Sequence, residues 1–157
     1  MNIKEIDYKE NAKISAEMLD KYTKNKKPEA LDILRKKISF VLEDEGQIVS
    51  RLTGSISFNG LHIELFITDS NTRGKGYGTE IFKFVEELAR EKGYHYIVLE
   101  TMSFNAPRFY INRGFEIIKK VDNTPIEGES FYFMFKSLRY NYLYLSSYYF
   151  SSSYFCC

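Results

Sequence analysis

The sequence predicts a single α/β domain followed by a tail of different composition. The chain has 157 residues, a length typical of one domain. Segments with helical periodicity alternate with short segments rich in Ile, Val, Phe and Tyr, which are typical of strands. In chain order the elements are ααβββαβαββ, which combines antiparallel hairpins with a central β-α-β crossover.

The first half of the expected domain contains two helices and three strands. Apolar side chains at helical spacing predict a helix over 12–24 and a second, short helix over 29–36. Strands are expected over 38–42, 47–58 and 61–68. We expect Asn59-Gly60 to form a hairpin turn, because both residues tolerate positive φ. A leading strand near residues 3–6 would raise the total number of strands from six to seven.

A glycine-rich segment follows the third strand and precedes an amphipathic helix that ends at Gly93. Three of the nine glycines lie within residues 74–78. A strand-to-helix turn presents free backbone N–H groups, and the helix dipole adds about half a positive charge. The segment is therefore a candidate phosphate site, although its glycines could also serve packing alone. The spacing fits neither a Walker A loop nor the GxGxxG dinucleotide fingerprint.

The second half of the domain completes the sheet. A strand is expected over 94–99, and a short helix begins at Ala106-Pro107 and ends at Gly114, with proline in its tolerated first turn. Two further strands, 115–121 and 130–136, enclose a loop over 122–129.

Two motifs in this order resemble the GNAT superfamily of N-acetyltransferases. Arg73-Gly74-Lys75-Gly76-Tyr77-Gly78 resembles the acyl-CoA pyrophosphate loop, R/Q-x-x-G-x-G/A, and residues 105–115 resemble the A-x-x-x-Y-x-x-x-G-F stretch. The resemblance covers residues 38–138 well and the N-terminal helices loosely, with an overall likeness to a bacterial subgroup of uncharacterised acceptor. It implies a mixed central sheet of six to seven strands, splayed at the acyl-CoA wedge and flanked by about four helices.

The resemblance also implies an activity and a cosubstrate. A GNAT enzyme moves an acetyl group from acetyl-CoA to an amine by direct attack in a ternary complex, without a metal. The backbone of the third strand would pair with the pantetheine arm, and the glycine-rich loop would hold the pyrophosphate. The cofactor-binding residues implied in this way are Phe66, Ile67, Thr68, Arg73, Gly74, Lys75, Gly76, Tyr77, Gly78, Thr79, Asn105 and Phe109.

Three residues are candidates for the chemistry. Tyr110 lies at the position of the family's tyrosine that protonates the leaving thiolate, and the alternative is that it packs the short helix against the sheet. Glu64 lies where many members carry a glutamate base, but burial would have to raise its pKa. His62 would share its face of the strand and has an ordinary pKa better suited to a base. Glu64, His62 or neither remains open. Many GNAT enzymes carry Asn where this chain has Ser103, and Asn105 is a possible substitute.

Charge and composition limit the partners and the location. The net charge of +1 argues against general nucleic-acid binding. No apolar run is long enough for a transmembrane helix and the N-terminus lacks a signal peptide, so we expect a cytoplasmic protein, monomeric or homodimeric, with no membrane contact. The acceptor would be a small-molecule amine or a protein amino group. The alternative function is a catalytically weak acyl-CoA-binding sensor or interaction module on the same fold.

The catalytic domain is expected to span residues 1–138. Residues 139–157 form a low-complexity tail rich in Tyr, Ser and Phe, which ends in Cys156-Cys157 and which we interpret as an appendage outside the domain.

Overall fold

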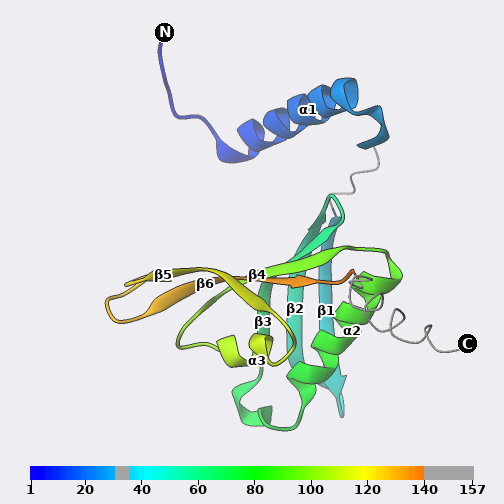
Figure 1. The fold of residues 1–157 in the computed structure, drawn as a ribbon, viewed down its shortest axis with the longest axis vertical. Helices are drawn as coiled ribbons and strands as arrows, with labels where there is room; N and C mark the ends of the chain where they lie inside the picture. Colours follow the sequence, from blue (N-terminus) through cyan, green and yellow to red (C-terminus); the bar gives the residue numbers. More distant parts are fainter. Residues whose placement is uncertain (31–35, 140–157) are drawn as a thin grey trace, which may run out of the picture. The chain divides into compact units, whose positions relative to one another are not determined.

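A computed structural model describes residues 1–30 and 36–139, in two compact units that divide after Leu34. The first unit contains α1 (Tyr8–Lys26) and the 3-10 turn η1 (Pro28–Ala30) (Figure 1). Asp7 caps α1, because its carboxylate accepts a hydrogen bond of 2.9 Å from the Glu10 N–H. The helix expected over 12–24 is confirmed and is longer at both ends.

Two expectations near the N-terminus are not met. The leading strand near residues 3–6 is wrong, because residues 1–7 have no regular structure and lead directly into the Asp7 cap. Of the helix expected over 29–36, residues 31–35 lie outside the described residues. The structure does describe the first and last residues of this range. Residues 29–30 belong to the 3-10 turn η1, and Lys36 begins a strand. Of the tail, residues 140–157 lie outside the described residues, while the Arg139 guanidinium lies 2.7 Å from Nδ1 of His95.

The second unit is built on one mixed sheet of six strands. In chain order these strands are β1 (Lys36–Asp44), β2 (Gln47–Ser57), β3 (Gly60–Thr68), β4 (Tyr96–Met102), β5 (Glu116–Asp122) and β6 (Ser130–Ser137). Their spatial order is β1-β2-β3-β4-β6-β5, and only the β3–β4 pair is parallel. This is the α/β fold with a mixed central sheet that the sequence predicts.

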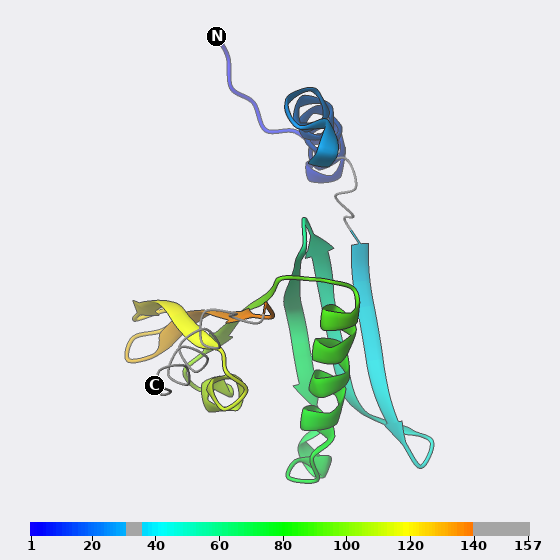
Figure 2. The ribbon, with the colours of Figure 1, turned by 45° about the vertical axis from the view of Figure 1, so that its right-hand side comes forward.

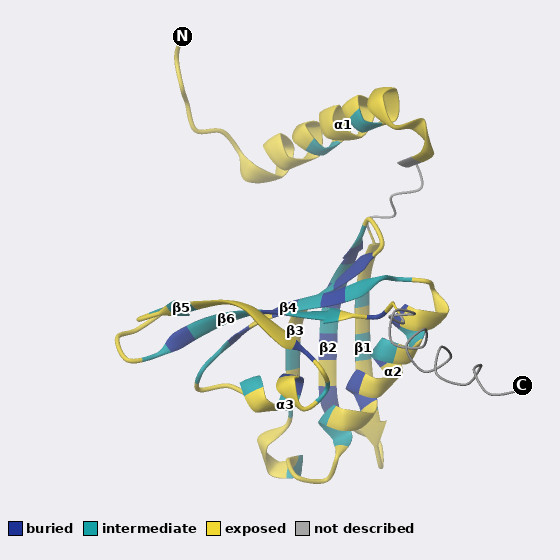
Figure 3. Cartoon of the chain, in the orientation of Figure 1, coloured by how far each residue is buried: buried dark blue, intermediate teal, exposed yellow. Residues whose placement is uncertain are grey.

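Two helices accompany the sheet, α2 (Tyr77–Glu91) and the short α3 (Pro107–Ile111). Figures 1 and 2 show α2 running along β1, β2 and β3. Its apolar face is buried, with Phe82 and Val85 at most 1% exposed and part of the same core cluster as residues of β2 and β3. Figure 3 shows buried positions along α2 and along these strands. No helix in the described part of the chain is long and apolar enough to cross a membrane.

The β2–β3 hairpin turns one residue earlier than expected. Ser57 pairs with Gly60, so Phe58 and Asn59 form the loop, and Phe58 has a φ of 56°. Gly60 itself lies in β3, where a Cβ would be 2.1 Å from Cζ of Tyr96. A Cβ at Gly60 would therefore force the Tyr96 ring to move, so the glycine allows this ring to pack closely over the strand.

The sheet opens between β3 and β4. These strands pair only from Gly60–Tyr96 to Ile63–Leu99, and beyond this point β3 stays with β2 while β4 stays with β6. A β-bulge lies at the point of divergence: Gly54 and Thr53 of β2 oppose Ile63 and Leu65 of β3, which leaves Glu64 as the extra residue. Because bulges bend a strand and increase its twist, the bulge at Glu64 favours this divergence.

Candidate functional site

A cleft of about 770 Å³ occupies the opening between β3 and β4. One wall is the second half of β3, and the other is the end of β4 with the start of α3. The turn that precedes α2 closes one end. Of the predicted site residues, the lining includes Glu64, Phe66, Ile67, Thr68, Arg73, Gly74, Gly76, Tyr77, Gly78, Thr79, Asn105, Phe109 and Tyr110. His62 and Lys75 are not among the lining residues.

The glycine-rich turn presents the N-terminus of α2 to this cleft. Gly76 is the N-cap residue with a φ of 90°, a left-handed conformation that favours glycine. Its carbonyl accepts from the N–H groups of Thr79 and Glu80, at 2.8 and 3.0 Å. Among the described residues, the preceding N–H groups of Tyr77 and Gly78 have no hydrogen-bond partner. These free amides and the helix dipole make this end of the cleft suited to an anion.

Gly78 allows α2 to approach β3 closely. A Cβ at this position would lie 2.9 Å from Oγ1 of Thr68 and 3.3 Å from Cζ of Phe66. The first turn of α2 and the end of β3 are thus in direct contact. A larger residue would push these two walls of the cleft apart.

Tyr110 also lines the cleft, where it belongs to an aromatic cluster. Its side chain is 8% exposed, and its ring contacts Phe66, Phe82, Phe109 and Phe115 at centroid distances of 5.3 to 6.5 Å. Burial raises the pKa of Tyr110 to about 12, so the hydroxyl remains protonated at neutral pH. Within the described residues this hydroxyl has no hydrogen-bond partner, which leaves its proton available to a molecule in the cleft.

Glu64 is held by two neighbouring strands. Oε1 of this carboxylate accepts from Nζ of Lys37 at 2.6 Å and from Oγ of Ser55 at 2.7 Å. These hydrogen bonds stabilise the charged form, and the one from Lys37 is the main reason that the pKa of Glu64 lies below its ordinary value. In this arrangement Glu64 is a charged group at the cleft wall, without the raised pKa that a base would need.

His62 is directed to a carboxylate that the sequence did not single out. Its Nε2 lies 2.6 Å from Oε2 of Glu100, across the parallel β3–β4 pair. Glu100 itself lines the cleft, where β4 leaves β3. In the sequence, Glu100 is marked only as an acidic residue at the end of an otherwise apolar strand. The pairing of the strands is what places it at the cleft.

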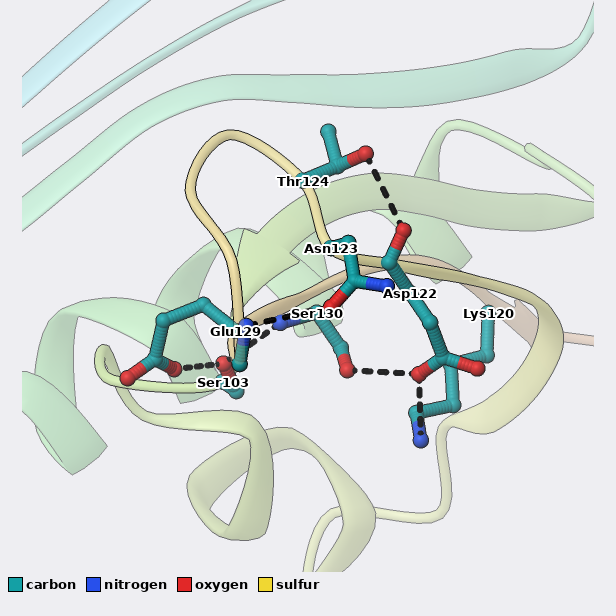
Figure 4. Close-up of polar contacts among 8 residues, drawn as sticks. Ser103, Lys120, Asp122, Asn123, Thr124, Glu129 and Ser130 are labelled. Carbon is teal, nitrogen blue, oxygen red and sulfur yellow. Dashed lines mark hydrogen bonds and ion pairs between the residues drawn. The ribbon is translucent and has the colours of Figure 1, made fainter.

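Ser103 serves a different purpose from the asparagine that many GNAT enzymes carry there. Its hydroxyl donates to Oε2 of Glu129 and accepts from the N–H of Ser130 at 2.9 Å. Ser130 in turn donates to Oδ1 of Asp122 at 2.9 Å (Figure 4). Ser103 thus ties the β5–β6 loop to the end of β4 and is not among the cleft-lining residues, whereas Asn105 is.

Comparison with known proteins gives consistent matches. The sequence model described as the acetyltransferase (GNAT) family matches residues 10–115. Blasticidin-S acetyltransferase from Streptomyces morookaense is 28% identical over 88 residues, which span 55% of this chain and 65% of that protein, just under two thirds of its length. The crystal structure of an acetyltransferase from Bacillus cereus has 29% identity and a TM-score of 0.76, over 88% of this chain and 98% of that one.

A further solved structure was obtained with a ligand. Aminoglycoside 6'-N-acetyltransferase complexed with coenzyme A has a TM-score of 0.60, over 89% of this chain and 98% of that chain. At 15% sequence identity this is a likeness of fold alone.

Proposed function

Because the chain belongs to the acetyltransferase (GNAT) family, we propose that it transfers an acetyl group from acetyl-CoA to an amine. The observation that carries this proposal is the cleft where β3 and β4 diverge. It joins free backbone amides at the start of α2 to the protonated hydroxyl of Tyr110. An anion site and a proton donor on one cleft are what transfer from a phosphate-bearing thioester requires.

The lining residues fit acetyl-CoA. The amides of Tyr77 and Gly78, with the side chain of Arg73, would hold the pyrophosphate, since all three residues line the same end of the cleft. The backbone of β3 from Phe66 to Thr68 has no β4 partner and would pair with the amide-containing pantetheine arm, much as a neighbouring strand would. Acetyl-CoA supplies the activated acetyl group.

The chemistry proposed is direct attack. The lone pair of the acceptor nitrogen forms the new C–N bond at the thioester carbon, the C–S bond breaks, and the CoA thiolate takes up a proton. Tyr110 is the proposed donor of that proton, because it is protonated and its hydroxyl has no partner among the described residues. An acceptor that arrives as an ammonium ion loses two protons from nitrogen, one before attack, which frees the lone pair, and one as the amide forms, and a base or water must take them up.

The acceptor is proposed to arrive as an ammonium ion, whether on a small molecule or on a protein. Glu64 and Glu100 line the cleft at the divergence and provide negative charge there. Glu64 and His62 both remain candidates for the base. The lowered pKa of Glu64 favours a role in attracting the cation, or in passing a proton through water, over direct abstraction.

An acceptor screen tests the proposal. Purified full-length protein is incubated with acetyl-CoA and a panel that contains blasticidin S, aminoglycosides, polyamines and peptides with free N-terminal amines, and free thiol is measured over time. Thiol release that depends on one class of amine is expected. The Gly76→Glu variant is the control, since bulk and negative charge in the anion site should abolish CoA binding.

The alternative is a catalytically weak acyl-CoA-binding sensor on the same fold. Tight CoA binding by calorimetry without turnover on any acceptor would favour this alternative. Absence of CoA binding by the folded wild-type protein would contradict both functions.

A further inference from the structure

Arg113 connects the α3 wall of the cleft to the end formed by the first turn of α2. The residue follows α3, and its Nη1 donates to the carbonyl oxygen of Phe109 at 2.9 Å. Its Nη2 donates to Oγ1 of Thr79, in the first turn of α2, at 2.5 Å. The guanidinium carbon lies 3.4 Å from the centroid of the Phe109 ring. Phe109 and Thr79 both line the cleft, although Arg113 is not among the lining residues.

Glu86 is near enough to favour the charged form of Arg113, but its carboxylate pairs directly with Lys136. Among residues 1–30 and 36–139, no carboxylate forms an ion pair with this guanidinium. The side chain is only partly exposed. Partial burial lowers the pKa of Arg113 and disfavours its charged form, so an anion in the cleft would further stabilise that charge.

The hydrogen bond from Arg113 also leaves the Thr79 hydroxyl free to act as a donor. Because Oγ1 accepts from Nη2, the single hydroxyl proton of Thr79 must point elsewhere. Within the described part of the chain, no acceptor takes that proton. Thr79 lines the cleft together with Tyr77 and Gly78, so a ligand bound at the helix N-terminus is a candidate acceptor for this proton.

We propose that Arg113 is a positioning residue for the phosphates of the cosubstrate. It turns the Thr79 hydroxyl into a donor directed at the anion site, and its own charge adds to the positive potential of that site. The inference rests on the proposed function, because it takes a phosphate-bearing ligand as the occupant of the cleft. It gives Arg113, which lies outside the glycine-rich motif, a role in ligand binding.

The test separates phosphate recognition from a general structural role. We compare the wild type with Arg113→Met and Arg113→Lys, measuring Kd for CoA by calorimetry. We also measure kcat/KM with acetyl-CoA and with S-acetylpantetheine, a donor without phosphates. Arg113→Met should weaken CoA binding about tenfold to a hundredfold, as expected for a charge-assisted interaction. It should leave kcat/KM for S-acetylpantetheine unchanged. Arg113→Lys, which keeps the charge, should recover part of the loss.

Thr79 provides an independent pair of variants. Thr79→Val should weaken CoA binding, Thr79→Ser should retain it, and Arg113→Met should have a much smaller effect in the Thr79→Val background. If Arg113→Met fails to fold, Arg113→Lys is combined with Thr79→Val in its place, and its effect on CoA affinity should again be smaller than in the wild type.

Three results would overturn the inference while leaving the proposed function intact. They are unchanged CoA affinity in Arg113→Met, an equal loss with both donors, and equal CoA affinity in Thr79→Val and the wild type. Failure of the folded wild type to bind CoA would instead remove the proposed function, and with it the premise of this inference.

Discussion

The ammonium of Lys37, on β1, reaches across β2 to bind the bulged carboxylate of Glu64 on β3, with Nζ and Oε1 2.6 Å apart. Lys37 is opposite Ser55, which donates to the same carboxylate oxygen. Three adjacent strands therefore converge on one charged group at the cleft wall. This contact keeps Glu64 ionised and places a primary ammonium, the chemical group of the proposed acceptor, against it.

Replacing Lys37 tests whether Glu64 acts as the base. Lys37→Met removes the largest cause of the lowered pKa, so the pKa of Glu64 should rise toward its ordinary value. If Glu64 is the base, the acid limb of the kcat/KM profile moves to higher pH in this variant. Profiles over about pH 4 to 8 with saturating acetyl-CoA measure the shift. A limb that does not move, or that persists in Glu64→Gln, would point to His62 or to solvent.

Tyr110→Phe should separate chemistry from binding. The variant keeps the ring and its contacts with Phe66 and Phe82 but removes the proton donor. We expect kcat to fall about tenfold to a thousandfold with little change in CoA affinity, in the range of general acid catalysis. Steady-state kinetics and calorimetry give the two quantities. An unchanged kcat would exclude Tyr110 from the chemistry.

The same residue should make the protein sensitive to alkali. The pKa of Tyr110 is about 12 in the folded state and 10.0 as an unperturbed group, so this contribution to stability is fully present below pH 10. As the pH rises from about 10 to 12, only the unfolded chain releases this proton. Folding is then disfavoured by about 2–3 kcal/mol. Urea unfolding of the wild type should show this loss, and Tyr110→Phe should lack that part of it.

Two glycines of similar conformation provide a matched comparison. Gly76, at the anion site, has a φ of 90°, and Gly46, in the β1–β2 turn, has a φ of 76°. An added Cβ would meet nothing within 4 Å at either position. Alanine should therefore destabilise each by about 1 kcal/mol through backbone strain alone. Only Gly76→Ala should also weaken CoA binding, because it alters the orientation of the α2 amides. Equal CoA affinity in both variants would contradict the pyrophosphate assignment.

Ser103→Ala distinguishes loop anchoring from cosubstrate contact. The variant removes the hydrogen bonds to Glu129 and to the Ser130 N–H, which tie the β5–β6 loop to β4 (Figure 4). Because Ser103 does not line the cleft, we expect Kd for CoA to stay within about twofold, and stability to fall by about 1 kcal/mol. A selective loss of CoA affinity would instead give Ser103 the role of the asparagine found in many GNAT enzymes.

The fold was largely accessible from the sequence, because its strands and helices carry strong local patterns. The six strands, α1, α2 and α3 follow from periodicity, glycine and proline positions. The sequence could not place the hairpin turn, because Phe58 adopts positive φ where Asn59-Gly60 looked more suitable. The reason is tertiary: Gly60 pairs within β3 and packs closely against the Tyr96 ring.

The site was accessible only where motifs are contiguous. The glycine-rich turn and Tyr110 could be named in advance. Glu100 and Arg113 could not, because their contacts with His62 and Thr79 join residues 38 and 34 positions apart in the chain. The contact between Lys37 and Glu64 also could not be predicted, because it depends on the register of the strands. This contact lowers the pKa of Glu64, whereas a base would need a raised pKa.

The divergence of β3 from β4 leaves an unpaired strand edge inside the sheet. The β3 backbone beyond Ile63 has no partner on the β4 side, although it lies next to strands that are fully hydrogen-bonded. Exposed edges of this kind recruit further strands, and proteins usually protect them with charge, bulges or cover. Here the bulge and the carboxylate of Glu64 lie at the point where β3 and β4 begin to diverge. A slender, extended molecule with amide groups could form hydrogen bonds with this free backbone edge. A second protein chain would be too wide, because it would meet the walls of the cleft.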